Sequence, residues 1–462
     1  MTLTDRAWSE LQRIFPPDRV SRGPSVLDLH SRDESFHEPC RPEAVAWPTT
    51  TDEVRRAVAW AGEHAVPVTP WGAGTSIEGN PIPVRGGLVL DFAQMNRILE
   101  VRPEDFLVTV EPGVLYTDLN VELNRRRTGL FFPPDPGAAA SVGGMVANNA
   151  SGIRTVRYGP TRRFVKRLEV VLADGRAVEV GTLAPKTSSG LDLVGLWVGS
   201  EGTLGVFTRI VLELAPLPPE VLTALVPFAD AEPATRAVAQ IMGSGLGVAA
   251  CEFLDRHTVR VVERAARLGL PDRPILFLEF HGTSRPGLEA DARLVEEICR
   301  VEGAESFEAG VGADERARLW EARHRAYRTI REAHVGEGIL IVDAAVPRSR
   351  YPELAARARQ ILDRRGLTGY IFGHAGDGNL HCLILGRMGD EALWASIHEA
   401  NAEIVETALT LGGTATGEHG VGLGKRRFQR REHGTGLDLM AEVKRLLDPQ
   451  GILNPGKIFP ED

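Results

Sequence analysis

Two histidines in one predicted hairpin are the residues whose type and spacing point most directly to chemistry. His374 and His381 lie in the run 370–385, where strand-like apolar stretches flank Asp377-Gly378. Asp-Gly favours a two-residue type I′ turn, and pairing outward from that turn predicts His374 opposite His381 on one face. Their Cβ atoms would then be about 5 Å apart. Neutral imidazole binds Zn, Mn and Fe, so the pair predicts two metal ligands. Ordinary strand histidines are the alternative.

A glycine-bounded loop offers the groups that such a metal site still needs. Glu418 and His419 follow Gly417 and precede Gly420, after a predicted helix at 390–411. Glu418 would complete a set of two histidines and one carboxylate with open positions. His419 is expected to point elsewhere and remain uncoordinated, and a histidine beside a metal suits a general base near neutral pH. A loop histidine bonded to the backbone is the alternative.

Three glycine-rich segments predict a second kind of site. They are 70–76 with Glu78-Gly79-Asn80 behind it, 132–152, and 199–206. Glycines let the backbone approach a ligand closely, and successive free N–H groups bind anions. The first segment matches neither a P-loop nor a G-x-G-x-x-G fingerprint. The second carries almost no charge and suits wrapping around a large, flat, buried ligand. A plain βα turn and a disordered linker are the alternatives.

In this order, the three segments resemble the FAD-binding domain of the vanillyl-alcohol oxidase/p-cresol methylhydroxylase (PCMH) type, over about residues 41–220. The resemblance implies that the first segment wraps the pyrophosphate, the second lines the dinucleotide and isoalloxazine, and the third touches the adenosine end or the ring. Some relatives bind the flavin covalently through a histidine in the first segment. Gly74-Thr75-Ser76 has none, which predicts non-covalent FAD.

The residues implied to bind the cofactor share small or polar side chains within these segments, with one addition near the C-terminus. They are Pro70, Trp71, Gly72, Ala73, Gly74, Thr75, Ser76, Pro134, Asp135, Gly137, Ala140, Ser141, Gly143, Gly144, Asn148, Asn149, Gly152, Glu201, Gly202, Gly205, Val206 and Asn454.

Both histidine motifs resemble those of the FAD-linked oxidase family that contains D-lactate dehydrogenase, the flavoprotein component of glycolate oxidase and D-2-hydroxyglutarate dehydrogenase. With the FAD domain, the match covers about residues 41–460. It implies that His374, His381 and Glu418 bind one divalent metal, Zn first with Mn or Fe as alternatives, and that His419 takes the hydroxyl proton. Arg323 matches the arginine that holds the substrate carboxylate, a task that suits a guanidinium. A solvated helix arginine is the alternative.

The same resemblance implies that the chain returns to the flavin domain near its C-terminus, at Asn454 in Leu453-Asn454-Pro455-Gly456-Lys457. An ordinary turn is the alternative reading of this residue.

Two positions depart from the hydroxyglutarate branch of this family. Leu383 stands where that branch has an asparagine, and Ile341 stands where it has a lysine for the distal carboxylate. A buried carboxylate without polar partners is costly, so a monocarboxylate with a short or apolar side chain is favoured. The D-lactate dehydrogenase branch is the closer match. It implies a FAD-dependent dehydrogenase that oxidises a D-2-hydroxy acid to the 2-oxo acid by hydride transfer to flavin N5.

Other functions remain open on the sequence alone. Within the family, the alternatives are a glycolate oxidase-type flavoprotein and a D-2-hydroxyglutarate dehydrogenase. A metal-dependent hydrolase explains the histidine cluster but not the glycine-rich segments. A non-catalytic flavin-domain partner in a larger complex needs neither the metal ligands nor His419. A reductase of the muramate-precursor type gives no reason for the metal hairpin.

The elements that must position these residues indicate two kinds of α+β domain. A capped amphipathic helix at 51–65 and strands at 65–70, 87–92, 106–111, 167–173, 176–181 and 205–214 belong to the first kind, with a tight hairpin at Asp174-Gly175. A Pro-rich run at 214–219 predicts a boundary. Alternating strands and helices after it suggest a ferredoxin-like layer.

The predicted organisation has four parts in chain order. They are an N-terminal helix (4–15) and linker over 1–40, a two-part PCMH-type FAD-binding domain over 41–219, a substrate- and metal-binding cap domain over 220–425, and a C-terminal segment over 426–462 that packs back on the FAD domain.

Composition limits the partners. The chain has 462 residues, 43% of them apolar and 25% charged, and a net charge of −9, which argues against a general nucleic-acid partner. Four scattered cysteines predict a reducing, cytoplasmic setting without a disulfide framework. No signal peptide or spanning segment is predicted, so membrane contact would be at most peripheral, at its inner face. A cytochrome, a quinone and an electron-transfer flavoprotein are all open as electron acceptor, and a homodimer is possible.

Overall fold

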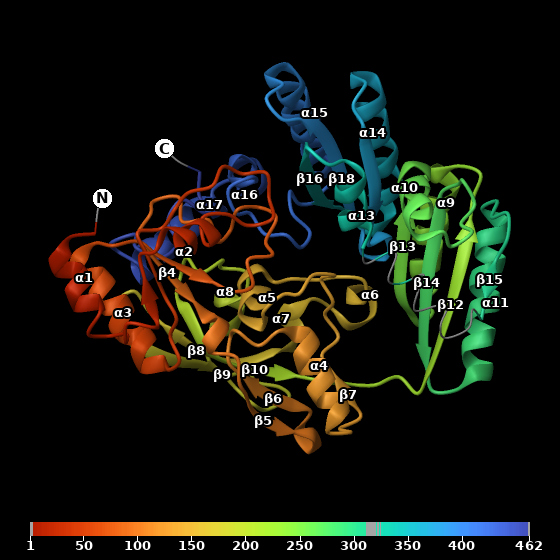
Figure 1. Cartoon of the computed structure of the whole chain (residues 1–462). Coiled ribbons are helices and arrows are strands. Elements are labelled where there is room, and N and C mark those ends of the chain that lie inside the picture. The colour runs from red at the N-terminus through yellow and green to blue at the C-terminus, as the bar shows by residue number, and fades with distance from the viewer. Residues whose placement is uncertain (1–2, 311–319, 321–322, 324, 461–462) are drawn as a thin grey trace. The chain divides into compact units, whose positions relative to one another are not determined.

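The computed structural model describes residues 3–310, 320, 323 and 325–460. The chain divides into two compact units (Figure 1). Unit 1 consists of Met1–Ser151, Pro160–Leu217 and Glu418–Asp462, and unit 2 consists of Gly152–Gly159 and Pro218–Gly417. The chain therefore passes from one unit to the other after residues 151, 159, 217 and 417.

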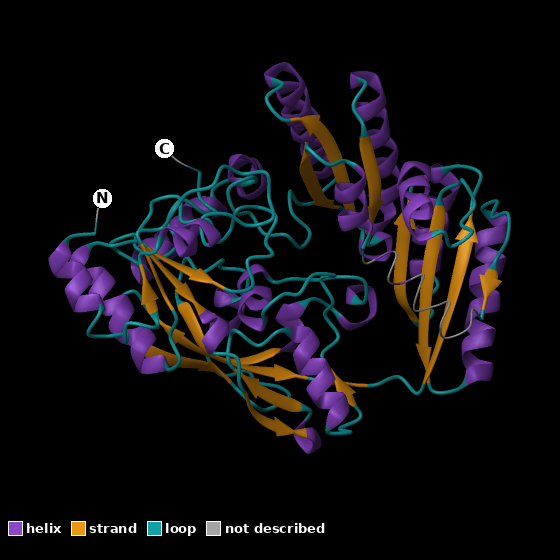
Figure 2. Cartoon of the chain, viewed as in Figure 1, coloured by secondary structure: helices purple, strands orange, loops and turns teal. Residues whose placement is uncertain are grey.

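Unit 1 contains a small, partly parallel sheet and a larger antiparallel sheet (Figure 2). In the small sheet β2, β4 and β3 run parallel and β1 pairs with β2 at the edge. Its strands, in spatial order, are β1 (Val20–Ser21), β2 (Ala44–Ala46), β4 (Leu88–Asp91) and β3 (Val68–Trp71). The antiparallel sheet consists of β5 (Ile98–Arg102), β6 (Leu107–Val110), β10 (Val206–Glu213), β8 (Val165–Val171) and β9 (Ala177–Gly181), and β7 (Leu130–Phe131) pairs with β11 (Ala215–Pro216).

Helix α3 (Thr51–His64) joins these two sheets into one core. Thr50 caps it by accepting a hydrogen bond from the backbone N–H of Glu53, 3.3 Å away. The residues expected on its apolar face, Val54, Ala57, Val58 and Ala61, are all buried. They share one hydrophobic cluster with Leu88 and Leu90 of the small sheet and with Val171 and Val206 of the antiparallel sheet. The predicted two-part domain is thus confirmed.

The other helices of unit 1 are short. They are α1 (Asp5–Leu11), α2 (Pro24–Leu29), α4 (Tyr116–Arg125), α5 (Val142–Asn148), α7 (Thr161–Phe164), α8 (Leu193–Trp197), α16 (Gln429–His433) and α17 (Gly436–Leu447). The N-terminal helix predicted over 4–15 is shorter, ending at Leu11.

The hairpin predicted at Asp174-Gly175 joins β8 to β9, as expected. The backbone N–H of Leu172 donates to the carbonyl of Arg176 at 2.9 Å, so the loop holds three residues. Gly175 has φ +81°, and a Cβ there would lie 2.9 Å from the carbonyl oxygen of Arg55 in α3. The turn needs glycine for its backbone conformation and for this close approach.

Unit 2 is built on one sheet with the strand order β15-β12-β14-β13-β17-β18-β16. The first four strands follow the 4-1-3-2 spatial order of a ferredoxin-like unit, with the additional helix α10 between the second and third strands. The other three have a β-α-β-β-α order and join the first group through the pairing of β13 with β17. The strands are β12 (Glu220–Pro227), β13 (Val248–Leu254), β14 (Ile275–Gly282), β15 (Glu308–Ala309), β16 (Glu337–Ala345), β17 (Gly369–Gly373) and β18 (Asn379–Arg387). The expected ferredoxin-like layer is thus present.

Helices α11 and α15 cover one face of this sheet, and polar side chains lie on the other. A Cβ on Gly386 would meet Trp394 and Ile397 of α15, and a Cβ on Gly282 would meet Leu288 of α11. Side chains alternate between faces along a strand, so odd-numbered residues of β14 and β18 point to the opposite face. The helices of unit 2 are α6 (Thr155–Tyr158), α9 (Ala231–Gly243), α10 (Arg256–Ala266), α11 (Arg285–Val301), α13 (Ala326–Ala333), α14 (Tyr351–Arg365) and α15 (Glu391–Thr410).

The short segment Gly152–Gly159, which contains α6, is held in unit 2 by side-chain contacts. Tyr158 Oη lies 2.8 Å from His281 Nδ1, and His281 Nε2 lies 2.7 Å from Glu279 Oε1. Arg157 donates to the carbonyl of Gly247 at 2.7 Å. Burial raises the pKa of Tyr158. This buried polar chain explains why the segment leaves unit 1 although the sequence on both sides of it belongs there.

Two expectations about covalent and membrane features can be compared with the structure. All four cysteines are free thiols. Among the described residues, no helix has the length and apolar composition needed to span a bilayer.

Candidate active site

The histidine hairpin differs from its predicted register. His381 pairs with Phe372, and β17 ends at Gly373, so His374 lies outside the strand pair. Residues Ala375–Asp377 form a 3-10 turn, in which the carbonyl of His374 accepts the N–H groups of Asp377 and Asn379. The predicted two-residue turn and the pairing of His374 with His381 are therefore wrong. The chain forms a longer local hydrogen-bonded turn, which Gly378 closes with φ +76°.

The two imidazoles nevertheless lie together. Their ring centroids are 5.1 Å apart and their planes are perpendicular. Both residues are buried. The turn that takes His374 out of the strand returns its side chain toward His381, so the structure supports the expected proximity by a different backbone path.

Glu252 of β13 orients His374. Its Oε1 lies 2.8 Å from His374 Nδ1, and the carboxylate is almost fully buried. Such carboxylate–histidine pairs commonly orient metal-binding imidazoles. Burial raises the pKa of Glu252, but the neighbouring His374 and Arg323 lower it by a larger amount, so the net shift is downward.

Arg323 is buried beside the same carboxylate. One of its terminal nitrogens forms an ion pair with Glu252 Oε2, and its guanidinium lies 5.0 Å from the centroid of the Phe372 ring. Its Nε has no hydrogen-bond partner among the residues that the structure describes. These contacts exclude the solvated-arginine alternative.

Asp343 of β16 fixes the chain that leads to Glu418. It is fully buried and is the strand partner of His381. Asp343 Oδ2 accepts hydrogen bonds from Thr416 Oγ1 and from the backbone N–H of Gly417, both at 2.9 Å. Asp343 Oδ1 accepts one from the side chain of Asn379 at 2.7 Å. Gly417 is the last residue of unit 2, and Glu418 is the first residue of the final segment of unit 1.

Ile341 and Leu383, the two positions that depart from the hydroxyglutarate branch, are direct strand partners. Both are buried and lie two residues from Asp343 and His381 on the same face. The apolar surface that the sequence predicted from two separate motifs is therefore continuous.

The loop of His419 is held within unit 1 by two glycine-rich segments. Asn148 Nδ2 donates to the carbonyl of His419 at 3.2 Å. Glu201 accepts the backbone N–H groups of Val421 at 2.6 Å and Gly422 at 2.9 Å. His419 Nε2 lies 3.8 Å from Glu418 Oε1. His419 therefore lies beside Glu418 and does not point away from it as expected.

The structure brings the three glycine-rich segments together in unit 1. A Cβ on Gly72 would overlap Ser141 Oγ, which joins the first segment to the second. The backbone N–H of Glu201 donates to the carbonyl of Ala147 at 2.9 Å, which joins the third to the second. Asn80 Nδ2 donates to Glu201 Oε2 at 2.7 Å, which joins the first to the third. The three segments predicted to bind the cofactor are therefore in mutual contact within unit 1.

Several predicted cofactor residues use their side chains within the protein. Tyr116 donates to Asp135 at 2.8 Å, and Val206 lies in the hydrophobic core. Asn454 Nδ2 donates to the carbonyls of Asn80 and Glu201, at 3.0 and 2.7 Å. The backbone N–H of Asn454 also donates to Val68 in β3. The expected return of the C-terminus to the flavin domain is therefore present, and the Asn454 side chain ties two segments together.

Sequence reasoning missed Glu252, Asp343 and Asn379. Glu252 and Asp343 are single carboxylates inside the apolar runs 248–254 and 338–345. A lone charge in a buried strand is costly unless it is paired. That pattern marks both residues for a polar partner and could have identified them.

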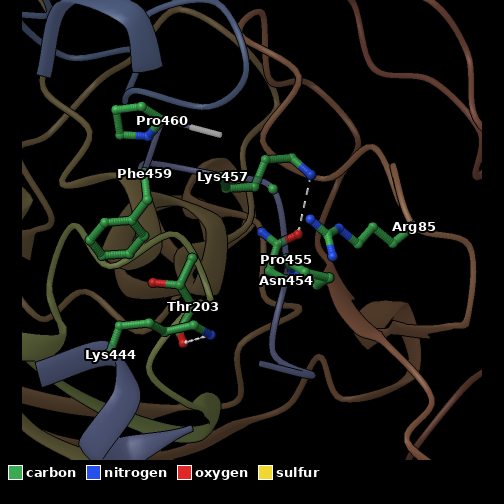
Figure 3. A pocket seen from close by; sticks show the side chains of 9 residues that line it. Arg85, Thr203, Lys444, Asn454, Pro455, Lys457, Phe459 and Pro460 are labelled. Atoms are coloured by element: carbon green, nitrogen blue, oxygen red, sulfur yellow. Dashed lines mark hydrogen bonds between the residues drawn. The ribbon is translucent and has the colours of Figure 1, made fainter. Parts of the chain in front are cut away.

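A separate cavity of about 510 Å³ lies at the C-terminal segment of unit 1 (Figure 3). Its cationic residues are Arg85, Lys444 and Lys457. Lys457 donates to the carbonyl of Ile82 at 2.6 Å, and Lys444 donates to Thr203 and Leu453 at 2.7 and 2.9 Å. Burial lowers the pKa of Lys457 to about 8. Both lysines therefore bind main-chain carbonyls of the fold, and none of the histidines expected to do chemistry lines this cavity.

The closely similar curated proteins match nearly the whole chain. It is 38% identical to a Danio rerio protein named "Probable D-lactate dehydrogenase, mitochondrial", over 98% of this chain and 92% of that protein. It is 37% identical to the glycolate oxidase subunit GlcD of Bacillus subtilis, over 100% of this chain and 98% of that protein. It is 37% identical to a mitochondrial cytochrome D-lactate dehydrogenase of Arabidopsis thaliana, over 98% and 80%.

Solved structures share the fold at low sequence identity. The 4-ethylphenol oxidase from Gulosibacter chungangensis has a TM-score of 0.82 at 20% identity and covers 99% of this chain and 97% of its own. The p-cresol methylhydroxylase with substrate bound has a TM-score of 0.79 at 18% identity, over 98% and 96%. These neighbours confirm the predicted fold class.

Two family models account for most of the sequence. One describes an FAD binding domain and matches residues 42–181, and the other describes the C-terminal domain of FAD linked oxidases and matches residues 217–458. The chain therefore belongs to the FAD-linked oxidases, and FAD is its cofactor.

Proposed function

We propose that this chain is a FAD-dependent dehydrogenase that oxidises a D-2-hydroxy acid, a D-lactate-like monocarboxylate, to the 2-oxo acid. The observation that carries the proposal is the buried arrangement around Glu252. One oxygen of this carboxylate contacts His374, and the other contacts Arg323. The Glu252 carboxylate thus orients both the histidine proposed to bind the metal and the arginine proposed to bind the substrate carboxylate. The names of the D-lactate dehydrogenase relatives support the same substrate class.

His374, His381 and Glu418 are proposed to hold one divalent metal, Zn first. The two imidazoles fit this task because their ring centroids are 5.1 Å apart and Glu252 orients the ring of His374. Glu418 is included because it follows Gly417 directly in the chain. The backbone N–H of Gly417 donates to Asp343, which is the strand partner of His381. When bound, such a metal would polarise the 2-hydroxyl and ease loss of its proton.

Residues of the chain would then bind the substrate and accept its proton. Arg323 binds the substrate carboxylate and orients the 2-carbon. His419 accepts the proton from the 2-hydroxyl oxygen. When bound, FAD would supply the hydride acceptor, at N5, for the oxidation of C2. The absence of a histidine from residues 70–76 supports a flavin held without a covalent bond.

Ile341 and Leu383 support a substrate with one carboxylate. They form a buried apolar pair next to Asp343 and His381. A second carboxylate there would lose water without gaining a cationic partner, which costs several kcal/mol. A short or methyl side chain, as in D-lactate, suits this surface.

A glycolate oxidase-type flavoprotein is the second candidate. The specific observation in its favour is the 37% identity to GlcD over almost the whole length of both chains. Under this alternative the same residues would act on glycolate, whose 2-carbon carries no methyl group. The electron acceptor is proposed to be a cytochrome, as the names of two relatives suggest, with a quinone or an electron-transfer flavoprotein as alternatives.

The test is anaerobic bleaching of the flavin near 450 nm on addition of D-lactate, with L-lactate, glycolate and D-2-hydroxyglutarate in parallel. Fastest bleaching by D-lactate, abolished by a chelator and restored by added Zn²⁺, is the expected result. Fastest bleaching by glycolate would favour the second candidate. A yellow protein that none of the four acids bleaches would overturn the proposal.

A further inference from the structure

The side chain of Glu201 forms hydrogen bonds with the loop of His419 rather than with its own segment. Its carboxylate is buried, and both of its oxygens accept hydrogen bonds. Oε1 accepts the N–H of Val421 at 2.6 Å, and Oε2 accepts the N–H of Gly422 at 2.9 Å and Nδ2 of Asn80 at 2.7 Å. Each of these partners is a donor and favours the ionised carboxylate, whereas burial raises the pKa of Glu201. Hydrogen bonds to an ionised acceptor are about twice as strong as neutral ones.

The backbone of the loop is shaped to reach this carboxylate. Gly420 has φ +83°, and a Cβ there would lie 2.9 Å from Glu201 Oε1 and 2.8 Å from Asn80 Nδ2. Gly422 has φ +49°, and a Cβ there would overlap the carbonyl oxygen of Glu78. A side chain at Gly420 would therefore clash with the Glu201 carboxylate, and one at Gly422 would clash with the backbone of Glu78.

Glu201 itself is held in an unusual conformation. It has φ +52°, a left-handed value that residues with a side chain rarely adopt. Its N–H donates to Ala147, and its carbonyl accepts Nδ2 of Asn454. Separate parts of unit 1 thus fix a strained residue, and such strain persists only where the surroundings determine it strongly.

We infer that Glu201 is a positioning residue for His419, which it fixes through the two backbone N–H groups that follow Gly420. This inference rests on the proposed role of His419 as the base. Glu201 lies in the segment that the family resemblance implies contacts the flavin, and its carboxylate binds the loop. Asn148 also holds this loop, by donating to the carbonyl of His419. Small displacements of a catalytic group of about 1 Å can reduce a rate about 100-fold.

The test compares Glu201→Gln with Glu111→Gln. Glutamine keeps the shape but turns an NH₂ group toward donors, so the loop loses at least one bond. Glu111 is an equally buried carboxylate of unit 1 that bonds Arg97 at 2.6 Å and does not touch the loop. In E201Q the flavin should stay bound, the rate of flavin reduction should fall 10- to 100-fold, and the substrate Kd should change less than about 3-fold. E111Q should keep the wild-type rate. Loss of FAD from E201Q alone would overturn the inference in favour of a cofactor-binding role.

A double-variant cycle separates positioning from a general loss of structure. In a His419→Ala background, E201Q should reduce the remaining rate by less than about 2-fold, because Glu201 acts through His419. An equal fold-loss in both backgrounds would overturn the inference. If E201Q does not fold, Gly420→Ala tests the same contact from the loop side and should show the same non-additivity.

One readout does not depend on the proposed function. The rate at which diethylpyrocarbonate modifies His419, followed by peptide mass spectrometry, should change several-fold in E201Q and not in E111Q. If this change occurs while no 2-hydroxy acid bleaches the wild-type flavin, the proposed function fails and the positioning role stands. An unchanged modification rate overturns the positioning role even if D-lactate is the substrate.

Discussion

Glu252 Oε1 lies 2.8 Å from His374 Nδ1, in a hydrogen bond that is buried in the sheet of unit 2. The other oxygen of the same carboxylate pairs with Arg323. Removing this carboxylate should therefore affect two binding events, one of a metal and one of a substrate anion.

Glu252→Gln should weaken metal binding 10- to 100-fold, because the imidazole loses the group that orients it and increases its basicity. The measurement is metal content after dialysis against graded chelator concentrations. Glu279→Gln is the matched control, since Glu279 is a buried carboxylate of the same face that contacts His281. Equal metal loss in both variants would show that Glu252 has no special relation to the metal.

Arg323→Lys should raise the Kd for D-lactate about 10- to 100-fold with a smaller effect on the limiting rate of bleaching, because lysine cannot bind a carboxylate in two places. The measurement is the dependence of bleaching rate on substrate concentration. Arg328→Lys serves as control, since Arg328 is exposed and pairs with Glu332 on α13. An unchanged Kd in the Arg323 variant would remove this residue from substrate binding.

His419→Ala should keep the yellow colour and the metal but reduce flavin more than about 100-fold more slowly, since general base catalysis contributes about 10² to 10⁴ in rate. Flavin content, metal content and anaerobic bleaching are measured on one preparation. Reduction at the wild-type rate would end the assignment of His419 as the base.

Ile341→Lys combined with Leu383→Asn should shift preference toward D-2-hydroxyglutarate. The two residues are strand partners, so the new polar groups would be adjacent and could bind a distal carboxylate. The ratio of second-order bleaching constants for D-2-hydroxyglutarate over D-lactate should rise at least about 10-fold. A parallel fall for both acids would mean that this surface does not contact the substrate side chain.

Lys457 should make stability depend on pH. Burial lowers its pKa from 10.5 to about 8 in the folded protein, so between these values the unfolded chain binds more protons than the folded one. Stability then rises with pH, and the cost of burying the charge is largest below pH 8 and is relieved as the pH approaches 10.5. Between pH 7.5 and 9.5 the wild type should gain about 2 kcal/mol relative to Lys457→Met in urea unfolding at saturating FAD. Parallel curves for the two proteins would contradict this expectation.

Much of the fold could be predicted from local patterns. The apolar spacing of Val54, Ala57, Val58 and Ala61 predicted helix α3, and the short apolar runs predicted most strands, because burial of alternating side chains is a local property of the sequence. The hairpin of His374 was mispredicted because Asp377-Gly378 also fits a 3-10 turn, and the choice depends on hydrogen bonds to the His374 carbonyl.

The candidate site was predicted less completely than the fold. Glycine-rich segments and histidines can be recognised in the sequence, but the residues that orient them, such as Glu252, cannot. Glu252 contacts Arg323, more than seventy residues later in the chain, and His374, more than one hundred residues later. No local sequence pattern encodes contacts over such separations. The excursion of 152–159 into unit 2 was also hidden, since it depends on the partners of Tyr158 and Arg157 rather than on a change of composition.

The discontinuity of both units has a consequence for synthesis. Strand β3 pairs with Leu453, and Lys444 binds the carbonyl of Thr203, so unit 1 needs residues that follow the whole of unit 2. A nascent chain therefore cannot finish its flavin-binding half before its second half has left the ribosome. Domain-by-domain folding from the N-terminus, which is common in larger proteins, is unavailable to unit 1. Until residues 444–453 have been synthesised, β3 and the carbonyl of Thr203 remain without these partners.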